Sequence, residues 1–206
     1  MAERFVTRGF SGRPRSAVGP AGRIPPGQHL VTDFPVLSAG PTPRIDLATW
    51  ELALSGLVRA PVKWSWTEFL ALPAEEFTKD ISCVTTWTKL DTRWRGVSVD
   101  TLLEHVELAP NALGLVAECH GGYTTNLLLS DAVNGQAFVA YEYDGKPLPP
   151  DHGGPARLVV PHLYFWKSAK WLRALRVVDR DRPGFWESNG YHIRGDPWKE
   201  ERYSGD

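Results

Sequence analysis

Hydrophobic and polar positions alternate over short stretches of this chain, and a period of two predicts strands. Trp50, Leu52 and Leu54 alternate with polar or small residues. Short apolar or alternating runs predict further strands over residues 77–84, 113–120, 136–143, 156–160 and 170–179. Asp144-Gly145 follows the third of these runs and predicts a hairpin turn.

Helix signals are few and short. Ser65 and Glu68 have the spacing of a capping box, which predicts a short helix that ends near residue 72, before Pro73. Ser98 is a suitable N-cap for a helix to about residue 106, with its apolar face at Leu102 and nearby residues. Many strands with few short helices indicate an α+β domain.

The domain organisation is simple. Residues 1–28 are rich in Gly, Pro and Arg, have little to bury, and are predicted to form an arm. We expect residues 29–206 to form one domain, because the chain shows no repeat and no dividing linker. The last 26 or so residues are polar and aromatic without a period, and we expect them to wrap the surface.

The composition of the chain gives no support for a nucleic-acid-binding protein or a membrane-spanning protein. A net charge of −1 gives no reason to expect nucleic-acid binding, and no apolar run is long enough for a membrane span. Nine Trp and 17 Pro favour a loop-rich fold with aromatic-lined clefts. The N-terminus has no apolar signal region, and two cysteines in a domain of this size need no disulfide, so a cytoplasmic location is expected.

Cys83 is the first candidate for chemistry. It ends a predicted strand and precedes a polar and aromatic loop that we expect to close at residues 94–96, before the second helix. A rigid strand aims such a thiol while the loop leaves room for a partner, as in reactive or metal-binding cysteines. The alternative is a buried structural thiol, because free cysteine is among the most buried residue types.

Familiar cofactor and metal motifs are absent from the sequence. It has no GxGxxG or GxxxxGK[ST] motif, no HExxH and no CxxC pair, so ordinary dinucleotide, P-loop and zinc sites are unsupported. A hydrolase that pairs Cys83 with one of the six histidines remains an alternative, although nothing marks the base.

A second stretch, residues 151–172, is suited to binding an anion. The basic residues His152, Arg157, Lys167 and Lys170 lie within it. Gly153 and Gly154 would let a ligand approach the backbone closely, and the planar guanidinium of Arg157 suits an oxyanion. The alternative is a hairpin whose cations are solvated.

Together, these stretches resemble the sulfite-oxidase-like molybdopterin oxidoreductases. The similarity lies in ISCVTTWTKLDTRWRGV, AECHGGYTTNL and GKPLPPDHGGPARLVVPHLYFWKSAKWL, preceded by DFPVLSAGPTPRIDLATWELALSG. It covers about residues 32–179 in family order. The resemblance implies the sulfite oxidase fold, with mixed β-sheets and short helices, and a molybdenum–molybdopterin cofactor.

The resemblance also implies roles for individual residues. Cys83 matches the catalytic thiolate that binds molybdenum beside the two dithiolene sulfurs of the pterin. Positions that match cofactor contacts are Thr32, Pro35, Val36, Cys119, His152, Arg157, Ser168, Ala169 and Lys170. Thr85, Trp87, Lys89 and Tyr123 are candidates to support the metal.

Departures from the family limit the prediction of a substrate. Animal sulfite oxidases have an arginine shortly after the metal cysteine, where this chain has TTWT at residues 85–88. The related methionine-sulfoxide reductases have an acidic residue two positions after the cysteine, where this chain has Thr85. The resemblance implies two-electron oxo transfer. Because these departures put sulfite in doubt as the substrate, we expect a small S- or N-oxide, with a separate electron-transfer partner. The alternatives are a non-catalytic module with this fold and the cysteine hydrolase.

Overall fold

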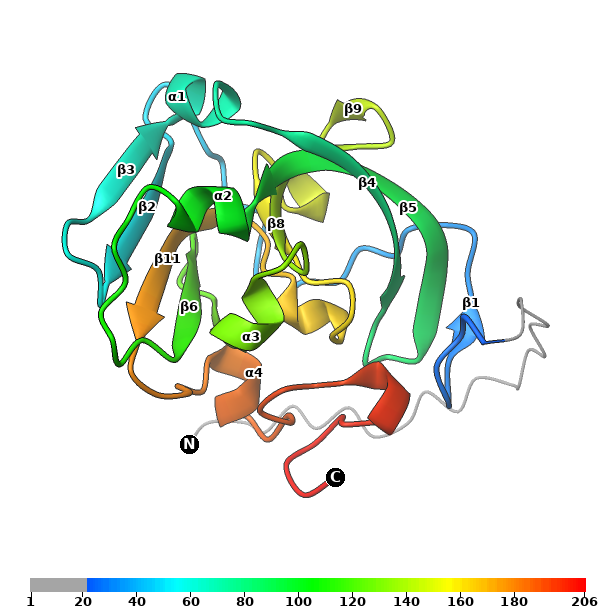
Figure 1. Cartoon of the computed structure of the whole chain (residues 1–206). Coiled ribbons are helices and arrows are strands. Elements are labelled where there is room, and N and C mark those ends of the chain that lie inside the picture. Colours follow the sequence, from blue (N-terminus) through cyan, green and yellow to red (C-terminus); the bar gives the residue numbers. More distant parts are fainter. Residues whose placement is uncertain (1–21) are drawn as a thin grey trace, which may run out of the picture.

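The structure is a computed structural model that describes residues 22–206, and two β-sheets dominate it (Figure 1). The first sheet has the central order β1-β5-β8-β10, with β4 paired to β5 and β9 paired to β8. Its strands are β1 (His29–Leu30), β4 (Glu75–Ser82), β5 (Trp87–Ser98), β8 (Phe138–Tyr143), β9 (Lys146–Pro147) and β10 (Arg157–Val159). The arm predicted over residues 1–28 lies outside the described residues as far as residue 21.

The second sheet has the order β3-β2-β11-β6-β7. Its strands are β2 (Glu51–Gly56), β3 (Val62–Ser65), β6 (Gly114–Cys119), β7 (Thr124–Leu128) and β11 (Leu172–Val178). β11 is parallel to β2 and antiparallel to β6, and β1 is parallel to β5 in the first sheet, so both sheets are mixed. The predicted mixed-sheet architecture is confirmed.

The helices are short, as expected. They are α1 (Trp66–Leu70), α2 (Val99–Leu103), α3 (Leu129–Ala132) and α4 (Phe185–Ser188), with 3-10 turns η1 (Pro150–His152), η2 (Phe165–Lys167) and η3 (Pro197–Lys199). The capping box of Ser65 and Glu68 starts α1, and the Ser98 hydroxyl accepts from the Thr101 amide at the start of α2. No helix in residues 22–206 has the length and apolar character to cross a membrane.

Two hydrophobic clusters fill the interior. The larger cluster includes Trp50, Leu52 and Leu54, whose alternation predicted β2, and each of these side chains is buried. The smaller cluster surrounds Cys83 and includes Trp87 and several other aromatic residues of the first sheet. The thiol is therefore placed where an aromatic core meets the end of β4.

The prediction of a loop after Cys83 is wrong for most of the predicted residues. β5 (Trp87–Ser98) occupies residues 87–98 and forms a long, curved hairpin with β4, visible across the top of Figure 1. Only a tight turn separates the strands, in which the Thr86 amide donates to the Cys83 carbonyl over 3.0 Å. Threonine and tryptophan favour strands, and Thr88, Thr92 and Trp94 are buried, so burial decides the conformation.

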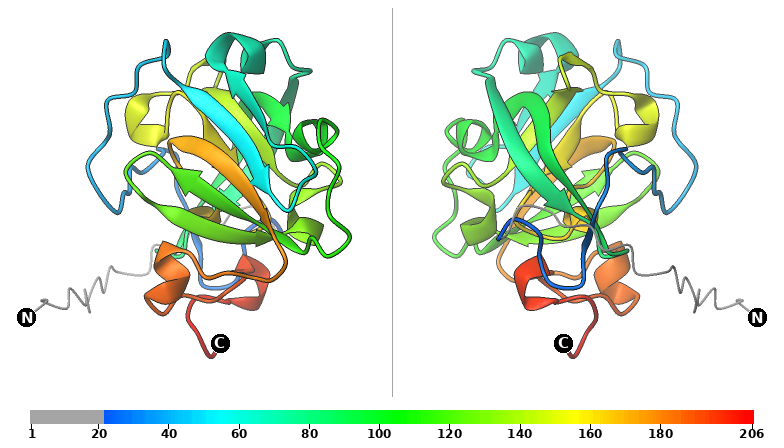
Figure 2. Two further views of the ribbon diagram at one scale, coloured as in Figure 1. Left: turned by 90° about the vertical axis from the view of Figure 1, so that its left-hand side faces the viewer. Right: turned by 90° about the vertical axis from the view of Figure 1, so that its right-hand side faces the viewer.

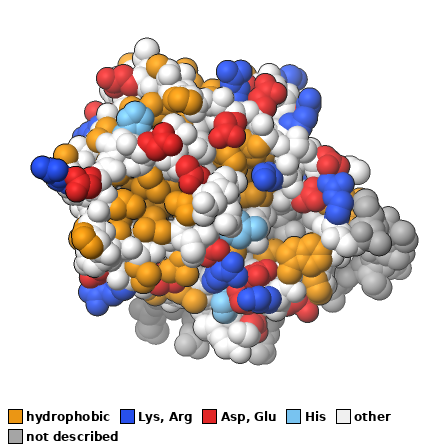
Figure 3. All heavy atoms as spheres, viewed as in Figure 1, with side chains coloured by type: hydrophobic (Ala, Val, Ile, Leu, Met, Phe, Trp, Pro, Cys, Tyr) orange, Lys and Arg blue, Asp and Glu red, His pale blue; other side chains and the backbone are white. Residues whose placement is uncertain are grey.

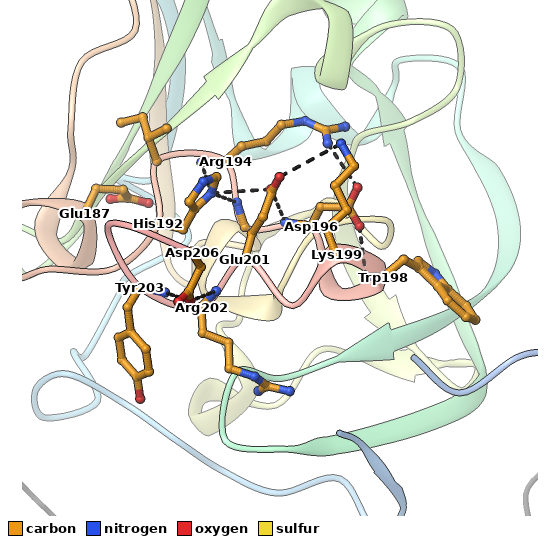
Figure 4. A network of polar contacts seen from close by, with 12 residues as sticks. Glu187, His192, Arg194, Asp196, Trp198, Lys199, Glu201, Arg202, Tyr203 and Asp206 are labelled. Atoms are coloured by element: carbon orange, nitrogen blue, oxygen red, sulfur yellow. Dashed lines mark hydrogen bonds and ion pairs between the residues drawn. The ribbon is translucent and has the colours of Figure 1, made fainter. Parts of the chain in front are cut away.

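The C-terminal residues, from about 180 on, lie across one end of the molecule, below the sheets (Figure 2, orange to red). Figure 4 shows the polar network that fixes them, in which the Asp196 carboxylate caps η3 and His192 faces Glu201. From this tail, the Arg202 guanidinium donates to the Val84 carbonyl over 2.8 Å. The tail thus contacts the turn that carries Cys83.

Charges of both signs are interspersed on the face drawn in Figure 3, and no patch of one sign dominates that face. Apolar side chains show between them over the sheets. In most ion pairs among the described residues at least one side chain is exposed, and in some both are, such as Lys63–Glu51 at 2.9 Å. The buried pair of Lys167 and Glu187 is the exception that bears on the site.

Candidate active site

A cavity of about 530 Å³ opens where the ends of several elements meet. The Cys83 turn forms one side, and the Gly121-Gly122 turn after β6 forms another. Further lining residues come from η1, β10, η2 and the segment just before β11, and from positions 37–41 and 43. Both glycines of the turn have φ of +87°, so the sharp turn after β6 depends on their conformational freedom.

Cys83 lies at the cavity with its side chain almost completely enclosed. Its exposure is 8%, and the Thr85 hydroxyl donates to Sγ over 3.2 Å. Burial raises the pKa of the Cys83 thiol, which the Thr85 hydroxyl partly opposes. The two cysteines of the chain are unpaired. Cys83 is therefore a protonated thiol at neutral pH unless a positive partner, such as a metal ion, stabilises its thiolate.

Arg157 is a buried cation at the same cavity. It is 1% exposed, donates to the carbonyl oxygens of His152 and Ser168 over 2.7 and 2.5 Å, and lies 4.2 Å from the Phe165 ring centre. No carboxylate among the described residues pairs with it. Burial lowers the pKa of Arg157 to about 9, so it remains charged at pH 7. A buried charge without a carboxylate partner is suited to binding an anion.

Lys170 and His152 extend the basic region. Lys170 Nζ donates to the Asp151 carbonyl over 2.5 Å, and burial, with Arg157 nearby, lowers the pKa of Lys170 to about 8. The His152 ring stacks on Phe34 with 4.1 Å between centroids. Burial first, then Arg157 and Lys170, lowers the pKa of His152. Binding of an anion would relieve the mutual repulsion of these three groups.

These residues fit a large anionic ligand that brings its own metal. No acidic residue is among the described residues that line the cavity, and no group of three His, Cys, Asp or Glu in residues 22–206 could hold a metal alone. Three buried nitrogens at the cavity have no hydrogen-bond partner within residues 22–206: Trp87 Nε1, His120 Nε2 and His152 Nδ1. Such atoms are costly unless a ligand or water satisfies them.

The cavity brings together most of the residues that the resemblance implied. The predicted residues that line it are Pro35, Cys83, His152, Arg157, Ser168, Ala169 and Lys170. Thr32, Val36 and Cys119 are not in the lining. The Thr32 carbonyl accepts from Lys89, Val36 is 52% exposed, and Cys119 is buried in β6 with its pKa raised to about 12 by burial.

Of the four residues expected to support the metal, Thr85, Trp87 and Tyr123 line the cavity. Lys89 does not, because it is turned toward the Thr32 carbonyl. The hydrolase alternative gains no support, because no histidine in the described residues hydrogen-bonds Cys83.

Two expectations for residues 151–172 are wrong. Lys167 does not join the basic cluster, because its Nζ lies 2.7 Å from Glu187 and 2.7 Å from the Asn126 side chain on another side of η2. Gly154 does not serve a ligand, because a Cβ there would lie 2.1 Å from the Leu148 carbonyl. The glycine is needed for chain packing instead.

Sequence reasoning missed several cavity residues. His120 lines the cavity and directly precedes Gly121-Gly122. A histidine beside two glycines after a predicted strand could have marked it as a site residue. Phe34, Trp166, Trp186 and Tyr191 also line the cavity. Their only signal was the high aromatic content of segments without periodicity.

Comparisons with known proteins place the chain in a family. Residues 39–186 match the family described as "Oxidoreductase molybdopterin binding domain". The chain is 44% identical over 187 residues to the uncharacterized oxidoreductase YuiH of Bacillus subtilis, which covers 90% of this chain and 94% of that protein.

More distant relatives carry named activities. The catalytic subunit MsrP, a protein-methionine-sulfoxide reductase of Gluconobacter oxydans, is 32% identical over 66% of this chain and 49% of its own length. Sulfite oxidase of Arabidopsis thaliana is 29% identical over 86% of this chain, which spans 56% of that protein. These two relatives are thus nearly twice as long as the part that this chain matches.

The fold also has a counterpart of known structure. The sulfane dehydrogenase SoxCD of Paracoccus pantotrophus matches with a TM-score of 0.62 and 22% identity, over 68% of this chain and 40% of that chain. This likeness supports the fold, while the sequence matches support the cofactor. The chain therefore belongs to the sulfite-oxidase-like molybdopterin oxidoreductases and is a molybdenum-dependent enzyme with a molybdenum–molybdopterin cofactor.

Proposed function

We propose that this oxidoreductase carries out two-electron oxo transfer on a small S- or N-oxide, with Cys83 as the protein ligand of molybdenum. The observation that carries the proposal is that Cys83 shares one cavity with Arg157 and Lys170. The cavity thus combines a cysteine sulfur, which becomes a soft thiolate ligand when a metal ion binds it, with two cations that have no carboxylate partner among the described residues. This arrangement matches a cofactor with a metal at one end and an anionic phosphate at the other.

Each residue has a task that follows from its contacts. When bound, the cofactor supplies the two-electron redox chemistry and the position at which oxygen is transferred. The Cys83 amide donates to the Trp87 carbonyl over 2.8 Å, which fixes the direction of the thiol. Two carbonyls hold the Arg157 guanidinium in place. Arg157 and Lys170 would bind the anionic end of the cofactor. The free His152 Nδ1 is available to the pterin.

Lys170 makes the anion site sensitive to pH. Its pKa in the cofactor-free protein is about 8, so an anion meets a charged ammonium below pH 8 and a neutral amine above it. We expect affinity for inorganic pyrophosphate to fall by up to about 10-fold per pH unit above this pKa. Calorimetric titration of cofactor-free protein between about pH 7 and 9.5 measures this dependence.

The Lys170→Met variant is the control for that titration. It should bind pyrophosphate more weakly and show a smaller pH dependence between pH 7 and 8.5, below the Arg157 pKa of about 9, whereas Lys170→Arg should bind more tightly than Lys170→Met at every pH. In cells that make the cofactor, Lys170→Met should also be purified with less molybdenum than Lys170→Arg. Equal affinity at every pH in the parent protein would show that Lys170 does not contact the anion.

A separate electron donor or acceptor is part of the proposal. The relative MsrP is named a catalytic subunit, which describes an enzyme with at least one further subunit. For this chain we propose an external electron-transfer partner, which a reduced dye can replace in the assay. The cytoplasmic location stays a prediction from the sequence.

A substrate screen with molybdenum-loaded enzyme tests the proposal. Dimethyl sulfoxide, trimethylamine N-oxide, nitrate and sulfite are each offered with a reduced or oxidised dye as appropriate. We expect turnover of at least one S- or N-oxide and little turnover of sulfite, because no arginine follows Cys83 within residues 84–88. Rapid sulfite oxidation, without turnover of either oxide by fully loaded enzyme, would overturn the proposal.

A further inference from the structure

One wall of the cavity consists of aromatic side chains to which the proposed function assigns no role. We name as the aromatic wall the lining residues Tyr123, Trp166, Phe185, Trp186 and Tyr191. Three of them come from α4 and the residues that follow it in the tail. The wall therefore belongs largely to the C-terminal tail, which wraps the end of the molecule in Figure 2.

Each ring of the aromatic wall contacts at least one other ring of the wall. Tyr191 stacks on Trp186 with 4.9 Å between centroids and meets Trp166 edge to face at 5.0 Å. Phe185 continues the contact to Trp186 at 5.0 Å and to Tyr123 at 5.9 Å. The surface is continuous, so it can bury a planar apolar group against several rings.

The aromatic wall is held rigidly from behind. The Glu187 carboxylate accepts from Trp166 Nε1 and from the Thr125 hydroxyl, each over 2.8 Å, and pairs with Lys167. The Tyr123 hydroxyl donates to the Trp166 carbonyl over 2.7 Å. Rings fixed in this way lose little conformational entropy when a ligand binds.

The aromatic wall also lies close to Cys83. Both belong to one cavity, and Tyr191 forms a β-bridge with Tyr203, next to the Arg202 that holds the Val84 carbonyl. A ligand near the metal position would thus meet these rings.

The five side chains of the aromatic wall offer no positive charge to an anion. The lining cations are Arg157 and Lys170, which lie beside His152 and donate to backbone carbonyls. The lining residues at positions 37–41 and 43 are neutral as well. An anion beside the aromatic wall would lose hydration without gaining a charged partner.

We propose that the aromatic wall binds a planar apolar substituent of the substrate, so that the enzyme prefers neutral aryl S- or N-oxides to small alkyl oxides and to anions. This inference rests on the proposed function and specifies its substrate class. In the reductive direction the S–O bond of a sulfoxide breaks, and two electrons from the partner or dye and two protons convert it to the sulfide and water.

The test compares two sulfoxides, methyl phenyl sulfoxide and dimethyl sulfoxide, with reduced dye and holoenzyme. We expect kcat/KM to be about 10-fold or more higher for the aryl compound, because its ring is buried against the aromatic wall. Trp186→Ala should reduce that preference several-fold, and Trp186→Phe should restore part of it. Trp198→Ala is the matched control, because Trp198 is 51% exposed on the same tail and does not line the cavity.

A binding measurement separates this inference from the proposed function. Methyl phenyl sulfone, which resembles the aryl sulfoxide, should bind holoenzyme more weakly after Trp186→Ala than after Trp198→Ala. Trp186-dependent sulfone binding without turnover of either sulfoxide would refute the proposed reaction and support the binding site. Turnover of both sulfoxides with equal kcat/KM, unchanged by Trp186→Ala, would overturn the inference and leave the reaction standing.

Discussion

Cys83→Ser is expected to lower turnover by more than about 100-fold while the protein stays folded. Replacing residues that merely support a metal ligand costs about 10- to 100-fold, and Cys83 is itself the proposed ligand. Serine has nearly the same size and can hydrogen-bond Thr85, which now donates to Sγ over 3.2 Å. The free energy of unfolding should therefore fall by less than about 2 kcal/mol. Dye-linked turnover and chemical denaturation measure the two effects.

Cys119→Ser is the matched control for that experiment. Cys119 is the only other cysteine in the chain, is 4% exposed, and does not line the cavity. Its replacement should cost stability, because a hydroxyl would be buried in β6 among apolar neighbours. The resemblance implied a cofactor contact at Cys119, but because its side chain lies outside the cavity lining, we expect turnover within a few-fold of the parent. A Cys83→Ser variant as active as Cys119→Ser would remove Cys83 from the mechanism.

Glu187→Ala is expected to destabilise the protein by about 3–5 kcal/mol, the largest stability change we predict. The side chains of Glu187 and Lys167 are both 1% exposed and lie 2.7 Å apart. Removing the carboxylate leaves a buried ammonium without its counter-charge, and the Trp166 and Thr125 side chains lose their acceptor. The midpoint of thermal unfolding should fall by roughly 6–20 °C for a domain of this size.

Glu51→Ala provides the comparison for Glu187→Ala. Glu51 pairs with Lys63 at 2.9 Å, but both side chains are more than half exposed, so we expect a cost below about 1 kcal/mol. Denaturant titrations of both variants measure the difference. Similar small costs for the two variants would show that the Lys167–Glu187 pair is not buried in solution.

Local sequence patterns predicted the elements whose determinants are local. The alternation of Trp50, Leu52 and Leu54 predicted β2, and the capping residues Ser65 and Ser98 predicted the starts of α1 and α2. The Asp144-Gly145 turn follows β8 as expected, with both residues at positive φ. In each case the signal lies within a few residues of the structure that it determines.

Features that depend on distant contacts were not predictable. β5 contains charged residues that interrupt its apolar pattern, and its pairing with both β4 and β8 determines its length. Lys167 carries no local sign that Glu187, 20 positions later, would neutralise it. The aromatic wall combines Tyr123 and Trp166 with rings of a tail that has no periodicity.

The most direct test of the account is X-ray absorption at the molybdenum edge, on parent protein and on Cys83→Ser loaded with cofactor. The account predicts that the parent shows one more sulfur ligand on molybdenum than the variant, with the loss matched by an oxygen or nitrogen ligand. An identical sulfur coordination in both proteins would contradict the account, because molybdenum would then be bound without Cys83.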